Sequence, residues 1–352
     1  MSKIQVLVVD DSVVIRKLVS TILAEDSHIE AAATAANGKI ALQKLAQNRF
    51  DLVMLDVEMP EMDGLETLVE LRKLYPSLPV IMFSTLTAAG ASVTLDALAL
   101  GASDYVTKPG GMGNMNAAMQ RIRDEILPKI KALCLDKYQE QPQPLLSVAY
   151  PTLLAEKNKI ALLAIGVSTG GPNALGALLP QLPKEFPVPI LIVQHMPPLF
   201  TKLLAERLAA KSHLNIREAI PGTVLAPGQV WIAPGDFHMT VEKVDGTYQI
   251  QTNQQVPENS CRPAVDALFR SVAKHYGKQA LVTVLTGMGQ DGLRGCKEVH
   301  DAGGEIYVQD AKTSVVWGMP GAVANAGIAH KILPLEQFPG EWLHRLAHGR
   351  TR

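Results

Sequence analysis

The sequence predicts an α/β protein of two domains, the second with a doubly wound, mostly parallel sheet. Two observations lead to this fold class. Short apolar runs of four to eight residues alternate with helical stretches along the chain, a pattern typical of parallel strands that are buried on both faces. The chain has 352 residues, whereas a single domain usually takes roughly 100–200, so we expect two separate cores.

Seven segments have the composition of such strands. In chain order they are IQVLVV (4–9), DLVMLD (51–56), PVIMFS (79–84), ALLAIGV (161–167), PILIVQH (189–195), QVWIAP (229–234) and ALVTVLT (280–286). The first five end at a polar residue, namely Asp10, Asp56, Ser84, Ser168 and His195. Open α/β sheets bind ligands at the carboxyl edge of their strands, so we expect the functional residues at these ends.

A stretch without strand character separates the two domains. It carries Pro142, Pro144 and Pro151 among Gln and Lys residues, and it follows a predicted helix at about 115–133. The boundaries that we predict are 1–124 for the N-terminal domain, 125–157 for the linker and 158–352 for the C-terminal domain.

Composition and charge argue against several classes of protein. With 47% hydrophobic and 19% charged residues, the chain is expected to be globular rather than disordered. No apolar run approaches the roughly 18 residues of a membrane span, and acidic residues stop the N-terminal apolar run, unlike in a signal peptide. Three widely spaced cysteines indicate a reducing compartment, so we expect a cytoplasmic protein. The net charge of −1 argues against a nucleic-acid binder.

Acidic residues gather at strand ends in the N-terminal domain. Asp10 and Asp11 follow the strand segment 4–9, and Asp56 ends the strand segment 51–56, so three carboxylates would crowd one pocket. Their repulsion favours a bound cation, and carboxylate oxygens suit Mg²⁺. Ser84 and Lys108, which end further strands, could help hold a phosphoryl group on Asp56. The alternative, that these aspartates only cap helices, is less favoured by the combination.

On these residues the N-terminal domain resembles the receiver domain of response regulators, across about 3–124. The motifs that carry the resemblance are VVDDS, MLDVEMPEMDGLE and the placement of Ser84, Tyr105, Lys108 and Pro109. The resemblance implies a flavodoxin-like, five-stranded parallel sheet with Asp56 as phosphoacceptor. It implies that Mg²⁺ is bound by Asp10, Asp11, Asp56 and the carbonyl of Glu58. Ser84 and Tyr105 would then be switch residues that sense the phosphate, and Lys108 would pair with it.

A serine stands in a glycine-rich turn of the C-terminal domain, where ALLAIGVSTGGPNALGALLPQLP reads as strand, turn and helix. Ser168 has three possible roles: a helix N-cap, part of a nucleotide-binding loop, or a nucleophile. The turn fits neither G-x-G-x-x-G nor a P-loop. It fits the G-x-S-x-G elbow of α/β-hydrolases formally. The free N–H groups of a following helix would stabilise a developing oxyanion.

A serine nucleophile needs an imidazole to take its proton and a carboxylate to orient that imidazole. His195 lies at a strand end, and Asp291 in LTGMGQDGLRG follows a later strand. The order Ser, His, Asp argues against the α/β-hydrolase family. His238 in PGDFHM is the best rival base.

The C-terminal domain resembles the catalytic domain of the chemotaxis methylesterase (CheB) family, across about 160–348. The matching motifs are GVSTGGPNAL, IVQHMPPLFTKLLAERL, APGQVWIAPGDFHM, SCRPAVDALFRSVA and LTGMGQDGLRG. The resemblance implies a triad of Ser168, His195 and Asp291, with the Met288 backbone N–H in the oxyanion hole and Thr169 beside the nucleophile. Phe237 and Cys261 stand where the family often has other residues. We expect neither to contact the triad.

Together these features predict a phosphorylation-activated serine hydrolase of a two-component system. It would demethylate glutamate γ-methyl esters on methyl-accepting chemotaxis receptors, would also deamidate receptor glutamines, and would need no cofactor for hydrolysis. A chemotaxis histidine kinase would be the phosphodonor. Two rivals are a DNA-binding regulator, for which no helix-turn-helix or basic face is evident, and a dinucleotide-binding enzyme that uses the 166–171 turn.

Overall fold

The computed structural model describes residues 3–108, 115–134 and 158–348. The chain divides into two compact units, Met1–Val148 and Ala149–Arg352. Within the part of the chain that the structure describes, every helix is too short or too polar to cross a lipid bilayer.

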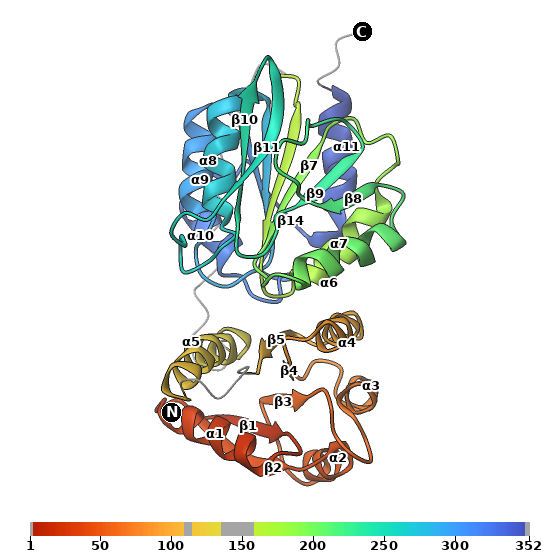
Figure 1. The fold of residues 1–352 in the computed structure, drawn as a ribbon, viewed down its shortest axis with the longest axis vertical. Helices are drawn as coiled ribbons and strands as arrows, with labels where there is room; N and C mark the ends of the chain where they lie inside the picture. Colours follow the sequence, from red (N-terminus) through yellow and green to blue (C-terminus); the bar gives the residue numbers. More distant parts are fainter. Residues whose placement is uncertain (1–2, 109–114, 135–157, 349–352) are drawn as a thin grey trace. The chain divides into compact units, whose positions relative to one another are not determined.

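The first unit is a five-stranded parallel sheet in the order β2-β1-β3-β4-β5. Its strands are β1 (Ile4–Val9), β2 (Ile29–Ala35), β3 (Leu52–Asp56), β4 (Val80–Ser84) and β5 (Asp104–Thr107). Its helices are α1 (Val13–Ala24), α2 (Gly38–Gln47), α3 (Gly64–Leu74), α4 (Ala88–Ala99) and α5 (Met115–Leu133). Helices α1 and α5 cover one face of the sheet, and α2, α3 and α4 cover the other (Figure 1). The predicted α/β fold of this unit is confirmed.

Helix α5 continues past the boundary that the sequence predicted at residue 124. Ile126 and Ile130 are fully buried in the same hydrophobic core as Val6 and Met54, so this part of the helix belongs to the first unit. Cys134 is also buried in that core. The rest of the predicted linker, 135–157, lies outside the described residues.

The second unit has a seven-stranded parallel sheet in the order β14-β13-β12-β6-β7-β9-β8 and a separate antiparallel hairpin. The sheet strands are β6 (Leu162–Val167), β7 (Ile190–Gln194), β8 (Asn215–Glu218), β9 (Gln229–Ile232), β12 (Ala280–Val284), β13 (Glu305–Gln309) and β14 (Lys331–Leu333). The hairpin strands are β10 (His238–Val244) and β11 (Thr247–Asn253).

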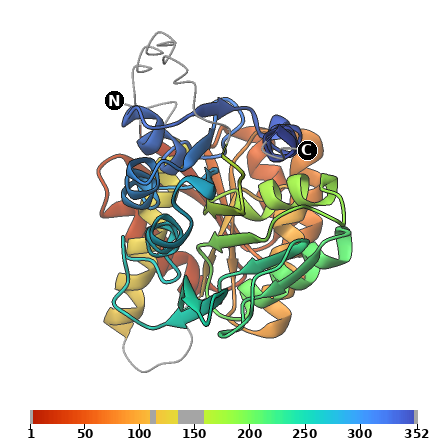
Figure 2. The same ribbon diagram turned by 90° about the horizontal axis from the view of Figure 1, so that it is seen from above.

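Helices lie on both faces of this sheet. They are α6 (Gly171–Leu178), α7 (Phe200–Lys211), α8 (Val265–Tyr276), α9 (Leu293–Asp301), α10 (Met319–Asn325) and α11 (Phe338–His348). Figure 2 shows α8 and α9 on one side of the sheet and α6, α7 and α11 on the other. The hairpin packs on the α8 side, where Val241 and Ile250 are buried in one core with Leu268 and Val272 of that helix.

The strand order of the second unit reverses beside its central strand β6. The chain continues from β6 to β7 on one side, and it later returns to place β12 on the other side. Such a switch point leaves a crevice at the carboxyl ends of the strands, where α/β proteins bind ligands. The residues that follow β6, β7 and β12 therefore meet at this crevice.

Candidate active site

Ser168 directly follows β6, at the switch point. Its backbone N–H donates to the Thr286 carbonyl at 3.0 Å, and its own carbonyl accepts from the N–H of Gly171 at 2.8 Å. The N-cap of α6 is Gly170, which has a φ of 79° and no side chain to cap with, so the N-cap role considered for Ser168 is wrong. The Ser168 hydroxyl donates to no described residue, so no structural hydrogen bond in this part of the chain occupies it.

Two glycines make room around this serine. A Cβ on Gly170 would lie 2.6 Å from Cγ2 of Val315, in addition to the strain of its left-handed backbone. A Cβ on Gly287 would lie 2.8 Å from the Ser168 Cβ and 2.4 Å from the Met319 sulfur. Neither position therefore accepts a side chain without moving the residues around the nucleophile.

His195 and Asp291 form a close pair beside Ser168. The distance from His195 Nε2 to Asp291 Oδ2 is 2.7 Å, and both side chains are almost entirely buried. The structure thus brings together the two residues that follow β7 and β12, as the sequence predicted. No hydrogen bond joins His195 to the Ser168 hydroxyl among the described residues.

The beginning of α8 holds the Asp291 carboxylate in place. Its Oδ2 accepts from the Val265 N–H at 2.6 Å, and its Oδ1 accepts from the Asp266 N–H at 3.0 Å. Oδ1 also accepts from the Gly292 N–H at 2.9 Å and from Asn259 Nδ2 at 2.9 Å. Helix α8 has no side-chain cap of its own, so Asp291 satisfies N–H groups that would otherwise be unpaired.

Electrostatics bias the proton toward the imidazole. Burial opposes ionisation of both groups, but their mutual hydrogen bond and the N–H donors outweigh it. The pKa of Asp291 is lowered and the pKa of His195 is raised above its ordinary value by Asp291, with a further contribution from Cys261. Asp291 therefore stays ionised and stabilises the imidazolium that forms when the ring takes a proton.

Cys261 contacts the predicted triad, and our expectation that it would not is wrong. Its Sγ lies 3.6 Å from His195 Nδ1, the ring nitrogen that does not bond Asp291. The sequence could not show this contact because residues 258 and 261 are linked by reciprocal backbone hydrogen bonds that turn the loop back toward β7. Phe237 is exposed, and whether it contacts the triad stays a prediction.

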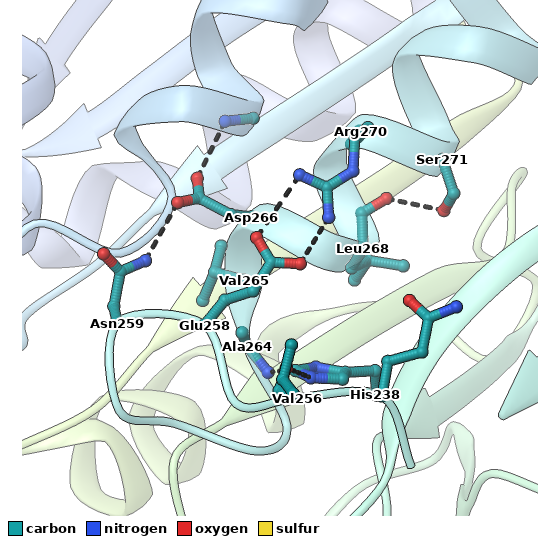
Figure 3. A network of polar contacts seen from close by, with 12 residues as sticks. His238, Val256, Glu258, Asn259, Ala264, Val265, Asp266, Leu268, Arg270 and Ser271 are labelled. Atoms are coloured by element: carbon teal, nitrogen blue, oxygen red, sulfur yellow. Dashed lines mark hydrogen bonds and ion pairs between the residues drawn. The ribbon is translucent and has the colours of Figure 1, made fainter. Parts of the chain in front are cut away.

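His238, the rival base, has both ring nitrogens occupied. Its Nδ1 accepts from the Ala264 N–H at 3.2 Å, so the proton is on Nε2, which donates to the Val256 carbonyl at 3.1 Å (Figure 3). The side chain is 1% exposed. His238 therefore fastens the loop before α8 to the hairpin and has no nitrogen free to act as a base.

Two further predicted residues border Ser168. Thr169 is buried, and its carbonyl accepts from Thr286 Oγ1 at 2.9 Å. Met288 follows Gly287, and its backbone N–H donates to no described residue, as an oxyanion donor requires. Sequence reasoning missed Gln194, whose Nε2 donates to the Ser168 carbonyl at 3.0 Å. Its polar side chain at the end of an apolar strand was the available signal.

The first unit carries an acidic cluster at the carboxyl edge of its sheet. Carboxylate oxygens of Asp10, Asp11 and Asp56 lie within 4.8 Å of one another. Lys108 Nζ lies 2.7 Å from Asp56 Oδ1 and 2.9 Å from Asp10 Oδ2. Asp56 Oδ2 is buried without a hydrogen-bond partner among the described residues, as expected of an oxygen that awaits a ligand. A pocket at this edge is lined by Asp11, Asp56 and Lys108 and also by the exposed residue Glu58.

Burial raises the pKa of Asp56 to about 6; the neighbouring Asp10 adds to this, whereas Lys108 opposes it. Carboxylates so crowded fit a hard cation, and the cluster can hold a metal ion.

Of the two expected switch residues, Ser84 points away from Asp56 in this structure. Ser84 is buried, and its hydroxyl donates to the Gly90 carbonyl at 3.2 Å rather than toward Asp56. Tyr105 is buried, and its carbonyl accepts from Lys129 Nζ at 2.6 Å. Ser84 is the last residue of β4, next to the acidic edge, whereas Tyr105 lies near the beginning of β5, opposite Met82.

Comparisons with known proteins agree with both units. A family model described as CheB methylesterase matches residues 163–341, and a response regulator receiver domain model matches residues 6–120. A protein-glutamate methylesterase/protein-glutamine glutaminase of Trichodesmium erythraeum is 50% identical over 98% of this chain and 100% of its own. One of Nocardioides sp. is 49% identical over 99% and 97%. The crystal structure of the Thermotoga maritima CheB methylesterase catalytic domain is 41% identical, with a TM-score of 0.52, over 53% of this chain and 98% of that one.

Proposed function

Because this chain belongs to the CheB methylesterase family, we propose that it is a protein-glutamate methylesterase with protein-glutamine glutaminase activity that serves adaptation in chemotaxis. Its substrates would be glutamate γ-methyl esters and glutamine amides on methyl-accepting chemotaxis receptors. The observation that carries this proposal is the His195–Asp291 pair at the switch point, next to a Ser168 hydroxyl that bonds none of the residues that the structure describes.

Hydrolysis would proceed through an acyl-enzyme. Ser168 Oγ attacks the ester carbonyl carbon while the neutral imidazole of His195 takes its proton, through the nitrogen that Asp291 leaves free. The Cys261 thiol now faces that nitrogen, so it must give way to the serine hydroxyl. The imidazolium then gives the proton to the departing methoxide, and methanol leaves.

Water completes the cycle by the same steps. His195 takes a proton from water, the resulting hydroxide attacks the acyl carbon, and the imidazolium returns its proton to the departing Ser168 oxygen. The glutamic acid that is released loses its own proton to solvent and becomes the carboxylate. In both halves negative charge develops on the former carbonyl oxygen. The Met288 N–H would stabilise it, and the lack of a partner for this group among the described residues supports that role. An amide substrate follows the same path with ammonia as the leaving group.

The first unit would act as a phosphorylation switch. Asp56 would accept a phosphoryl group from a chemotaxis histidine kinase, and Asp10, Asp11, Asp56 and the Glu58 carbonyl would hold Mg²⁺, which neutralises the charge of the transferred group. Lys108, already within 2.7 Å of Asp56, would pair with the phosphoryl oxygens. Ser84 would turn from the Gly90 carbonyl toward the phosphate, and the Tyr105 side chain would change its position as the second switch residue. We propose that the protein acts in the cytoplasm, together with the chemotaxis receptors and the histidine kinase.

Methanol release from a methylated receptor fragment tests the proposal. The full chain should release methanol, and phosphodonor with Mg²⁺ should raise the rate. Ser168→Ala should abolish release, whereas Ser212→Ala should not, since the Ser212 hydroxyl donates to the Leu179 carbonyl and accepts from the Leu214 N–H, neither of which belongs to the proposed site. Near-normal turnover by Ser168→Ala would show that the nucleophile is assigned wrongly. Retardation of genomic DNA fragments in a gel would favour the DNA-binding alternative instead.

A further inference from the structure

One amide nitrogen connects the catalytic carboxylate to a second buried carboxylate. Asn259 Nδ2 lies 2.9 Å from Asp291 Oδ1 and 3.0 Å from Asp266 Oδ2, so its two hydrogens reach two different acids. Asp266 is fully buried, and its other oxygen accepts from the Gly295 N–H at 2.7 Å. Figure 3 shows Asn259 reaching from its loop to Asp266 on α8.

The loop that carries Asn259, residues 258–262, is fastened on both sides. Glu258 forms an ion pair with Arg270 of α8, and Arg262 Nε donates to Asp236 Oδ1 at 3.0 Å (Figure 3 shows the first). Asn259 and Ser260 have φ values of 50° and 62°, a left-handed conformation that asparagine tolerates better than most residues. Asn259 itself is exposed at the surface, whereas the two acids that it joins are buried.

We propose that Asn259 is a positioning residue of the hydrolytic site, which holds the buried pair Asp266 and Asp291 together and thereby fixes the geometry of Asp291 against His195. This inference rests on the proposed role of His195 as the base. Two buried carboxylates in contact repel, and a donor shared between them offsets that repulsion. Without the donor, Asp291 would shift away from His195 or take up a proton.

The charges around these groups define what should change. His195 faces Asp291 and the Cys261 thiol. Asp266 faces Asp291, the buried thiol of Cys296 and, through space, the Arg270 guanidinium. A negative charge added at 259 should raise the pKa of His195, and a charge removed at 266 should lower it.

Exchanging the amide and the acid between positions 259 and 266 tests the proposal. Asn259→Asp keeps the shape and the backbone preference but puts a third carboxylate against the pair. We expect the pKa of His195 to rise by about one unit and kcat to fall about 10–100-fold. Asp266→Asn sets two amide nitrogens against each other. It should also lower kcat, but the pKa of His195 should fall.

The double variant Asn259→Asp/Asp266→Asn restores the original charge. The new amide at position 266 can keep its oxygen toward the Gly295 N–H and turn its nitrogen toward position 259, so the pKa of His195 should return toward its wild-type value. The carboxylate at 259 still faces Asp291 Oδ1 with no hydrogen between them, so kcat should remain low. Gln181→Glu is the matched control, since this exposed amide donates to the Ala177 carbonyl and should change neither quantity.

The pKa of His195 is measured by NMR on the full chain without substrate, and kcat by methanol release. Wild-type values for both in Asn259→Asp would overturn the proposal. If that variant does not fold, a folded double variant with the wild-type kcat overturns it. The pKa of His195 measured by NMR does not depend on Ser168. A wrong assignment of the nucleophile would therefore appear as full activity of Ser168→Ala and would leave the NMR result for Asn259→Asp unaffected.

Discussion

Replacing Asp291 by asparagine would change the proton on His195 while leaving the shape of the side chain unchanged. Asp291 Oδ1 accepts three N–H groups, from Asn259, Asp266 and Gly292, whereas Oδ2 accepts from Val265 and His195. An asparagine has only one acceptor oxygen. That oxygen should occupy the place with three donors, so the new NH₂ group faces the imidazole.

The consequence is a change of tautomer. The asparagine amide donates to His195 Nε2, and the neutral ring must then carry its single proton on Nδ1. A protonated Nδ1 cannot accept the proton of Ser168. We expect kcat to fall about 10⁴-fold, which is about 5 kcal/mol of transition-state stabilisation. The NH₂ group also confronts the Val265 N–H, which costs about 1–3 kcal/mol of the free energy of unfolding.

The assay is methanol release at saturating substrate, with thermal unfolding by circular dichroism to confirm that the variant is folded. Asp301→Asn is the control, because Asp301 is an exposed acid at the end of α9. Adding Asp291→Asn to Ser168→Ala should cause little further loss, since the three residues act as a unit. A folded Asp291→Asn variant that keeps more than a tenth of the wild-type rate would refute the tautomer argument.

Three further predictions concern separate parts of the chain. In the wild type, kcat/KM should rise with pH and reach half of its maximum above pH 6.5, because the pKa of His195 is raised and only the neutral ring accepts a proton. A half-maximum at or below pH 6.5 would contradict this. His238→Ala should lower the free energy of unfolding by about 1–3 kcal/mol in urea without shifting this pH dependence, since it leaves the buried Ala264 N–H without its acceptor. A shifted pH dependence would make His238 a candidate for the base again. Asp56→Asn should abolish Mg²⁺-dependent labelling by a small phosphodonor, and persistent labelling would place the phosphoacceptor elsewhere.

Residues at strand ends could be predicted from the sequence because two physical rules coincide there. A fully apolar run that stops at a polar residue marks both the end of a buried strand and the edge where ligands bind. Asp56, Ser168 and His195 all carry this signal, and the structure places each directly at or after its strand. Asp291 follows β12 by a longer turn, but its strand was equally clear.

Other parts carried no such signal. The hairpin β10–β11 has a polar, alternating sequence, and β8 is only four residues long, so neither reads as a buried strand. Asn259 and Cys261 lie in a loop whose path depends on two consecutive left-handed residues and on ion pairs with distant partners. Their contacts with the acid and the base arise only when the loop, α8 and β7 are assembled, and no local pattern predicts them.

Because Asp291 lies at the beginning of α8, it has a structural role that Ser168 lacks, and the two residues should be retained differently in relatives that lose the activity. Ser168 makes no side-chain bond among the described residues, so a descendant that lost hydrolysis could replace it without structural cost. Asp291 accepts the N–H groups of Val265 and Asp266, which open a helix that has no other side-chain cap. Selection for folding alone would therefore preserve Asp291, and an inactive relative of this fold should be recognised by a lost serine beside a retained aspartate.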